Sequence, residues 1–304
     1  MSLSSYRPTR SLLFLAVSLG LSSTAAAAPQ ATTLDAVQVT AAADASAQAR
    51  EALKRVPGAG NVIDVAKAHS RLSSNADVLA YQPGISAQSP GNEGTKISIR
   101  GSGINRGPGA HASGIAVSID GLPLTGPGGT PYELLEPLWL SRVEVLRGAN
   151  GFERGALALG GVIDYVSRSG RDSAGVQLHY EAGSRGYQKH GISWGGVSGD
   201  VDYFLVYTDT EFDGYQRHAR GDGKGAMANI GWQITPDLQT RFFVRYRETN
   251  HETPGRLTRD QIRNDPHAAN ASNLAIDARR PQPGSTWVGN VTTLQIDEDS
   301  SLQA

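Results

Sequence analysis

The sequence predicts an α+β domain followed by the first strands of a large antiparallel transmembrane β-barrel, which is incomplete in this chain. Three observations carry this prediction. The chain of 304 residues contains 36 Gly and no Cys, which indicates many turns and excludes a disulfide scaffold. Residues 53–170 combine short alternating strands with long glycine-rich loops. From residue 174 onward, two-faced strand patterns repeat to the end of the chain.

The amino terminus has the order of charges and apolar residues typical of a secretory signal peptide. Arg7 and Arg10 precede a ten-residue apolar run, and small residues follow it, so residues 1–27 are predicted to be the signal. The run is shorter than the roughly 20 residues of a membrane-spanning helix, which is the alternative interpretation. Residues 28–52 are rich in Ala, Thr and Gln and are predicted to be a flexible leader.

The domain at 53–170 is expected to contain one helix and one sheet. Apolar spacing predicts the helix over residues 75–81, and alternation predicts strands of a single sheet over 96–100, 115–119 and 142–146. Two loops rich in Gly and Pro, 101–114 and 121–131, lie between these strands. Because loops of this length are usually functional when ordered, we expect binding residues on them.

Residues 174–304 are predicted to form about six barrel strands. In one of them, Ala228, Ile230 and Trp232 alternate with Asn229 and Gln233. Tight turns at 199–200 and 236–237 alternate with long polar connections at 213–223 and 250–285, as in a transmembrane barrel. A soluble β-sandwich is the alternative. The predicted strands cover residues 176–182, 187–197, 201–212, 226–234, 242–246 and 286–296.

Composition and motifs argue against other functions. The chain has 28 basic and 29 acidic residues, so it lacks the overall positive field of a nucleic-acid-binding protein. The seven His residues show no ligand spacing, and we therefore expect neither a metal held by the protein nor a cofactor. Ser193 lies in a Gly-x-Ser-x-Gly motif inside an alternating strand, whereas a hydrolase needs a strand-to-helix turn there. A secreted β-rich enzyme is thus disfavoured.

Four ordered motifs in the middle region carry a resemblance to a known family. They are Ser-Ile-Arg-Gly at 98–101, Ile-Asp-Gly-Leu-Pro at 119–123, Arg-Val-Glu-Val-Leu-Arg-Gly at 142–148 and the glycine-rich stretch 155–164. This succession resembles the plug domain of TonB-dependent outer-membrane receptors. The stretch 252–258 is similar to siderophore receptors of the ferric-citrate type. The resemblance implies that residues 53–170 are the plug and residues 174–304 begin the barrel.

The resemblance also implies a function and a set of partners. It implies a receptor in the outer membrane of a Gram-negative cell, surrounded by lipid, that takes up a ferric siderophore or similar iron chelate and is not an enzyme. A binding-only surface protein and a receptor for another scarce nutrient are the alternatives. TonB of the inner-membrane energising complex is the implied protein partner, and it would add as a strand to the short β-prone segment formed by Leu34, Asp35, Ala36, Val37, Gln38, Val39 and Thr40.

Arginine positions supply most of the predicted site residues outside the TonB-binding segment. Arg100 and Arg147 resemble the plug arginines that pair with barrel carboxylates in this family. Guanidinium groups bind carboxylates with two parallel hydrogen bonds, which suits an anionic chelate. The candidates for ligand binding are Arg106, Thr130 and Tyr132 on the loops, and Arg245, Arg247 and Arg256 towards the outer end of a strand.

The number of predicted strands is too small for a closed barrel. Single-chain barrels begin at about 8 strands, and open strand edges are not tolerated in hydrocarbon. We therefore expect the chain to be a fragment of a longer receptor, which would be a monomer when complete.

Overall fold

The computed structural model describes residues 38–56, 58–68, 73–89, 95–102, 114–125, 130–148, 151, 158–297 and 300–304. Residues Ala36–Ala304 belong to one unit. The predicted signal peptide, residues 34–37 of the predicted TonB-binding segment and Arg106 lie outside the described residues. Among the described residues, none of the helices combines the length and the hydropathy needed to span a bilayer.

A helix replaces the later part of the predicted flexible leader. Helix α1 covers Gln38–Arg55, so the expectation of a flexible segment is wrong for residues 38–52. Gln38, Val39 and Thr40 lie at the start of this helix and not in extended chain. The reason is local, because the segment is dominated by Ala, Gln, Glu and Arg, which are all strong helix formers. Near its carboxyl end, Leu53 packs against a small cluster of buried apolar residues of the plug region.

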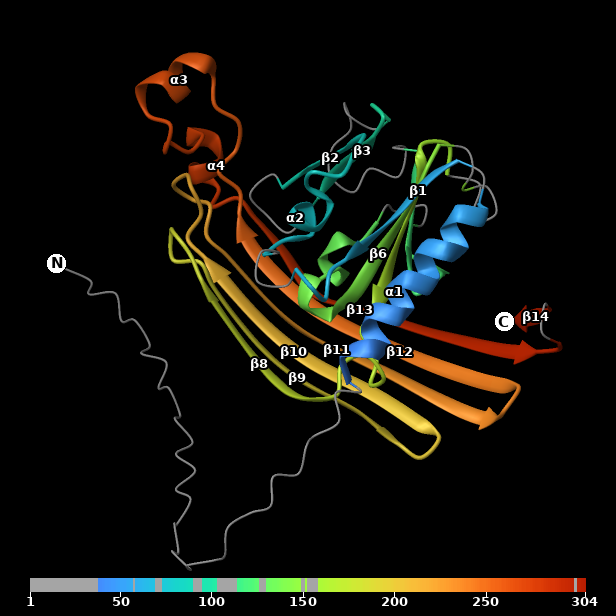
Figure 1. Cartoon of the computed structure of the whole chain (residues 1–304). Helices are drawn as coiled ribbons and strands as arrows, with labels where there is room; N and C mark the ends of the chain where they lie inside the picture. Colours follow the sequence, from blue (N-terminus) through green and yellow to red (C-terminus); the bar gives the residue numbers. More distant parts are fainter. Residues whose placement is uncertain are drawn as a thin grey trace, which may run out of the picture. The chain divides into compact units, whose positions relative to one another are not determined.

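Helix α1 is followed by the predicted α+β domain, which contains two sheets (Figure 1). The larger sheet has the order β1-β6-β7-β4-β5, with β4 and β7 parallel and the other pairs antiparallel. Its core contains Ile119, Val145, Ile163 and Tyr165, all fully buried. The strands are β1 (Ala59–Asp64), β4 (Ile115–Ile119), β5 (Leu122–Pro123), β6 (Leu140–Arg147) and β7 (Gly161–Ser167).

The second sheet corrects the prediction of a single one. β3 (Lys96–Ile99) pairs only with β2 (Ile85–Gln88), because consecutive strands joined by a short connection usually pair with each other. Helix α2 (Asn75–Leu79) precedes them and is capped by Ser74 and Asp77 in a capping box. Two short 3-10 helices, η3 (Tyr132–Leu134) and η4 (Pro137–Trp139), lead into β6.

The remainder of the chain forms one curved antiparallel sheet of seven strands in sequence order (Figure 1). All six predicted strands are present, most of them longer than the alternating patterns indicated, and a short seventh follows. The strands are β8 (Gly175–Ala182), β9 (Gln188–Ser198), β10 (Val201–Phe212), β11 (Gly221–Thr235), β12 (Leu238–Glu252), β13 (Arg279–Gln295) and β14 (Ser301–Gln303).

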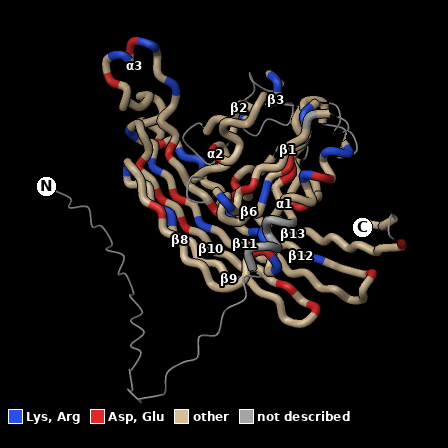
Figure 2. The backbone as a smooth tube through the Cα atoms, in the orientation of Figure 1, with Lys and Arg blue, Asp and Glu red and all other residues tan. Residues whose placement is uncertain are grey.

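The two faces of this sheet differ in chemistry. On β10, Leu205 and Tyr207 are exposed, whereas the intervening Val206 and Thr208 are buried. The buried face lies against the α+β domain, as the hydrogen bonds between the two regions require. The charged positions marked in Figure 2 occur along the strands as well as on the domain beside them. The alternation is therefore that of a wall with an apolar exterior.

The connections at the two ends of the strands are unequal in length. Tight turns join β9 to β10 and β11 to β12, whereas the connection between β12 and β13 contains helices α3 (Arg259–Asn264) and α4 (Ala271–Ala275). The sequence predicted a long polar loop here but not its helices, which begin at side-chain caps from Thr258 and Asn270.

Candidate functional site

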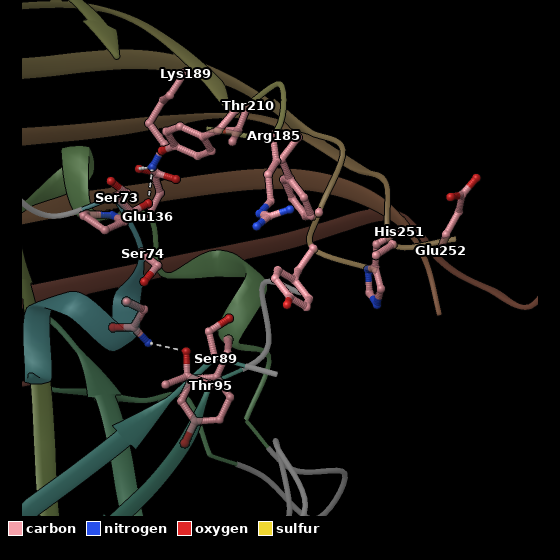
Figure 3. Close-up of a pocket in the computed structure, with 18 of the residues that line it drawn as sticks. Ser73, Ser74, Ser89, Thr95, Glu136, Arg185, Lys189, Thr210, His251 and Glu252 are labelled. Carbon is pink, nitrogen blue, oxygen red and sulfur yellow. Dashed lines mark hydrogen bonds and ion pairs between the residues drawn. The ribbon is translucent and has the colours of Figure 1, made fainter. Parts of the chain in front are cut away.

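A cavity of about 380 Å³ lies between the α+β domain and the strand ends of the sheet. Figure 3 shows side chains from both regions around it. Hydroxyl groups line one part of its surface, and three cations, Arg185, Lys189 and Arg247, line another. Glu136 and Glu252 are the acidic side chains of the lining, so the cavity carries one positive charge in excess. The hydroxyl lining consists of Ser73, Ser74, Ser89, Thr95, Tyr132, Ser184, Tyr187, Thr210, Tyr215 and Thr253.

Glu136 joins the inner domain to the sheet at the floor of this cavity. Its carboxylate lies 2.8 Å from Lys189 Nζ on β9 (Figure 3). It also lies 3.3 Å from Arg247 Nη1 on β12. The three side chains are only 2–3 % exposed. Burial alone would raise the pKa of Glu136, but the two cations hold that pKa below its usual value. A buried cluster of this kind is stable only while every member keeps its partner.

The local sequence places the Glu136 carboxylate with little freedom. Glu136 is the amino-terminal cap of η4, and Pro137 fixes the first residue of that helix. The side chain also accepts a hydrogen bond from the Leu138 amide at 3.4 Å. Lys189 Nζ is held in turn by the Ser73 carbonyl at 2.6 Å. The carboxylate is thus positioned from both sides before any ligand arrives.

A second contact joins the domain to β12 through Arg245. Its Nη1 donates to the Leu134 carbonyl at 3.0 Å, and its Nη2 donates to Ser167 Oγ at 2.6 Å and lies 3.8 Å from Asp120 Oδ2. Asp120 occupies the β4–β5 turn with a φ of 54° and accepts hydrogen bonds from the Ser167 amide and hydroxyl. Burial raises the pKa of Asp120 to about 6, against the opposing effects of Arg245 and Ser167.

An indole ring fills the space between these two charged contacts. Trp139 is fully buried, and the guanidinium carbons of Arg245 and Arg247 lie 5.8 and 5.9 Å from its centroid. Both distances allow cation–π attraction. The ring meets the sheet at Gly225, where an added Cβ would lie 3.0 Å from Trp139 and 2.5 Å from a backbone oxygen. Only a residue without a side chain fits under this ring.

Of the predicted ligand-binding residues, two line the cavity. Tyr132 does so from η3, and burial raises the pKa of its hydroxyl to about 12. Arg247 also lines it, but through a guanidinium already engaged by Glu136. Thr130 is not part of the lining itself, although its side chain is hydrogen-bonded to that of Tyr132, and its hydroxyl lies 2.8 Å from that of Thr125. Arg256 is exposed on the loop after β12 and is not part of the lining.

Arg245 requires a correction. The sequence predicts that Arg245 binds an anionic ligand, but this side chain is completely buried and hydrogen-bonded to the inner domain. The prediction failed because the sequence shows that an arginine faces inwards but not which groups it meets there. Arg245 is a contact between the two regions and not a ligand-binding residue.

The two arginines predicted to pair with barrel carboxylates both lie in the inner domain. Arg147 donates from Nε to the Pro83 carbonyl at 2.9 Å. Arg100 is exposed, with a φ of 50°, and burial together with Arg100 lowers the pKa of Arg147. Within the described residues, no ion pair joins either arginine to a carboxylate of the sheet. The pairing stays a prediction for strands outside the described chain.

The sequence offers no prediction for Glu136, Asp120 and Lys189, which take part in the ion pairs between the inner domain and the sheet. Glu136 did give a signal, because it is a lone acid within the apolar stretch 134–139. A buried carboxylate is costly unless paired. A carboxylate at such a place therefore indicates that a buried cation lies nearby. The sequence does not show that this cation comes from β9 or β12.

Comparisons with known proteins agree with this architecture. The family model of the TonB-dependent receptor plug domain matches residues 52–162. The fold resembles the ferric citrate transporter FecA, with a TM-score of 0.66 and 18% identity over 85% of this chain and 40% of FecA. It also resembles P. aeruginosa FpvA, with a TM-score of 0.60 and 18% identity over 80% of this chain and 32% of FpvA.

The copper transporter OprC is similar to nearly the same degree. Its TM-score is 0.59, with 14% identity over 80% of this chain and 35% of OprC. The fold is thus shared by transporters of different cargo, and the fold alone does not indicate which cargo is carried. The chain spans about 40% or less of the length of these three proteins. Residues 52–162 match the plug domain of TonB-dependent receptors, and antiparallel strands of an unclosed barrel follow them.

Proposed function

We propose that this chain contributes the plug and part of the wall of an outer-membrane receptor that takes up an anionic iron chelate, such as a ferric siderophore or ferric citrate. The cavity between plug and wall is the observation that carries the proposal. It combines cations, hydroxyl groups and a limited volume at the junction of the two regions.

The chemistry of the lining favours an oxygen-rich anion. Cations at a partly enclosed surface attract carboxylates more strongly than they do in open water. The hydroxyl of Thr210 is buried at the cavity wall without a hydrogen-bond partner among the described residues, so it can donate to a ligand oxygen. Arg185 lies over the Tyr215 ring at 4.3 Å, which orients its guanidinium beside the cavity.

Arg185 provides the test, because it lines the cavity and takes no part in the buried contacts. We expect Arg185→Gln to weaken binding of ferric citrate by about 1.5–3 kcal/mol, the range for one charge-assisted hydrogen bond. Arg217→Gln is the matched control, since Arg217 pairs with Asp265 outside the cavity. Binding is measured by calorimetry on the detergent-purified receptor, with a neutral ferric hydroxamate as second ligand. Equal affinity of both variants for ferric citrate would refute the role of the cavity.

The energy that releases the bound chelate would be supplied by TonB, which would bind residues 34–40 as an added strand. Strand addition depends on main-chain hydrogen bonds, and proline removes one donor. We expect Val37→Pro to abolish uptake of the iron chelate by cells while its binding at the cell surface is unchanged. Thr33→Pro, one residue before the segment, is the control. If Val37→Pro cells take up the chelate at the normal rate, residues 34–40 are not the coupling segment.

A further inference from the structure

Three potential metal ligands meet at the outer rim of the sheet, in segments far apart in the sequence. His218 lies between β10 and β11, Glu252 is the last residue of β12, and Asp277 lies just before β13. His218 Nδ1 is 3.8 Å from Glu252 Oε2 and 3.8 Å from Asp277 Oδ1. The three atoms lie within 4.8 Å of one another. Sequence spacing gave no sign of this group, because the fold alone assembles it.

Arg279 orients both carboxylates. Its Nη2 donates to Glu252 Oε1 at 3.0 Å, and its Nε donates to Asp277 Oδ2 at 2.9 Å. The second oxygen of each carboxylate is thereby turned towards His218. Glu252 Oε2 also accepts the Arg220 amide at 3.2 Å. Hydrogen bonds of this kind to ligating carboxylates are usual around bound metals.

His218 is the most informative member of the group. Its side chain is only 9% exposed, and its Nε2 lies 2.9 Å from the Ala278 carbonyl. A carbonyl can only accept, so Nε2 carries the proton and Nδ1 is left with its lone pair in the neutral ring. Nδ1 is too far from either carboxylate for a hydrogen bond. One nitrogen of this imidazole thus lies, without a hydrogen-bond partner, 3.8 Å from an oxygen of each carboxylate.

We propose that His218, Glu252 and Asp277 bind a divalent transition-metal ion of the Zn²⁺ type. Zinc takes imidazole nitrogen and carboxylate oxygen at about 2.0–2.2 Å, which corresponds to ligand separations near 3.3 Å in a tetrahedron. The observed separations are 3.8 Å from Nδ1 to each carboxylate oxygen and at most 4.8 Å between any two of the three atoms, so the ligands would move closer together on binding. Calcium is disfavoured because it requires 6–8 oxygen ligands. Three protein ligands leave the fourth position for water.

Local charge and position support a bound cation. The two carboxylates and Arg279 sum to one negative charge, which a divalent ion converts to one positive charge. The metal would join the β10–β11 connection to the β12–β13 connection. Ala219 and Glu252 of these segments also line the cavity, so the ion would stiffen the cavity rim. The site stands on its own ligands and does not depend on which chelate the receptor carries.

The test is Zn²⁺ binding to the detergent-purified full chain, measured by calorimetry. We expect one Zn²⁺ per chain, with at least about a tenfold loss of affinity in both His218→Gln and Asp277→Asn, as for other ligand-shell changes. Asp260→Asn removes an exposed carboxyl of the same connection and should bind Zn²⁺ like the unaltered chain. Circular dichroism checks that each variant is folded.

Co²⁺ absorption provides a second measurement on the unaltered chain. Binding at the site should give a visible absorption band of low-coordinate Co²⁺, which Zn²⁺ then removes. Equal Zn²⁺ affinity in the His218→Gln variant, or a chain that gives no such Co²⁺ band, would overturn the proposal. If the Co²⁺ band is missing, a protonated His218 would balance the negative charge of the two carboxylates in place of a metal ion.

Discussion

The two faces of the seven-stranded sheet differ in which side chains are exposed: apolar ones on the outer face, whereas charged ones on the inner face are buried. Strand β12 shows both. Val244 and Tyr246 project outwards and are 43% and 39% exposed, whereas Arg245 and Arg247, on the inner face, are 0% and 2% exposed. In a soluble sheet the apolar face would be the buried one. Here hydrocarbon is the expected solvent of the apolar face, and the plug covers the polar face. Strand alternation thus reports two different environments.

Two ion pairs make the difference between the faces measurable. Lys189 and Glu136 on the inner side are 2.8 Å apart, and Lys224 and Glu248 on the outer side are 2.7 Å apart. The geometry is the same, but the first pair is buried and the second is exposed. The energetic weight of the two pairs should therefore differ greatly, because the second pair lies near the strand ends, where we expect water to screen it.

The largest effect is expected from Glu136→Leu. The change leaves Lys189 and Arg247 as buried cations without their shared carboxylate. Breaking a buried ion pair from one side costs about 3–5 kcal/mol. We expect the free energy of unfolding in detergent to fall by that amount, and amide exchange to rise in residues 132–139. Glu211→Gln, an exposed position on β10, is the control and should leave both quantities unchanged.

A triple variant sharpens this result. Replacing Glu136, Lys189 and Arg247 together by apolar residues removes the charges along with their partner, which is often neutral for stability. If Glu136→Leu alone proves as stable as the unaltered chain, the plug does not depend on this contact, and the contrast between the two faces is wrong.

A pair of neighbouring residues on β11 tests the same contrast by volume. Gly225 faces inwards beneath Trp139, and Ala226 faces outwards. We expect Gly225→Val to cost about 1–3 kcal/mol, because the new side chain collides with the indole and with backbone. Ala226→Val should change stability by less than about 0.5 kcal/mol. Urea unfolding of both variants gives the comparison, and equal costs would mean that the plug does not rest on this part of the wall.

The pH dependence separates the two buried carboxyls of the plug that contact the inner face of the sheet. The pKa of Glu136 is lowered in the folded protein, so its contribution to stability is complete above the ordinary value of 4.5 and is lost as the pH falls through the folded pKa. The pKa of Asp120 is raised from 3.8 to about 6, so its contribution is complete below 3.8 and is lost as the pH rises through 6.

Unfolding measured across this range checks the signs. Glu136→Gln should remove the loss of stability at acid pH and leave the change near pH 6. Asp120→Asn should do the reverse. A Glu136→Gln variant that still loses stability below pH 4.5 to the same extent would assign the acid transition to another group.

The outer face was more readable from the sequence than the inner one. The alternation of Ala228, Ile230 and Trp232 with Asn229 identifies both the strand and its faces, because each side chain responds to a uniform solvent. The extent of β12 and β13 was underestimated because the alternating apolar pattern stops before the strands end. The residues at these ends are mostly polar, although the strand pairing continues to Glu252 and Arg279.

The inner face depends on contacts between distant residues, and these limit prediction. Arg245 and Arg247 look like ligand-binding residues when the sequence is considered alone. Their partners, Asp120 and Glu136, lie in the plug more than 100 positions earlier. No local pattern connects such residues. The leader was mispredicted for a different reason, because composition suggested flexibility while helix propensity and the packing of Leu53 stabilise α1.

The smallest effect is expected on the outer face, from Lys224→Ala. Lys224 and Glu248 are directly opposite each other on β11 and β12, and both remain accessible to solvent. Holding two long side chains in one arrangement costs entropy that nearly cancels their attraction. We expect the urea midpoint of the variant to match that of the unaltered chain, and added salt to have no effect on the difference. A loss comparable to that of Glu136→Leu would mean that the outer pair is shielded from water as well, and that the two faces do not differ in the way that their exposure indicates.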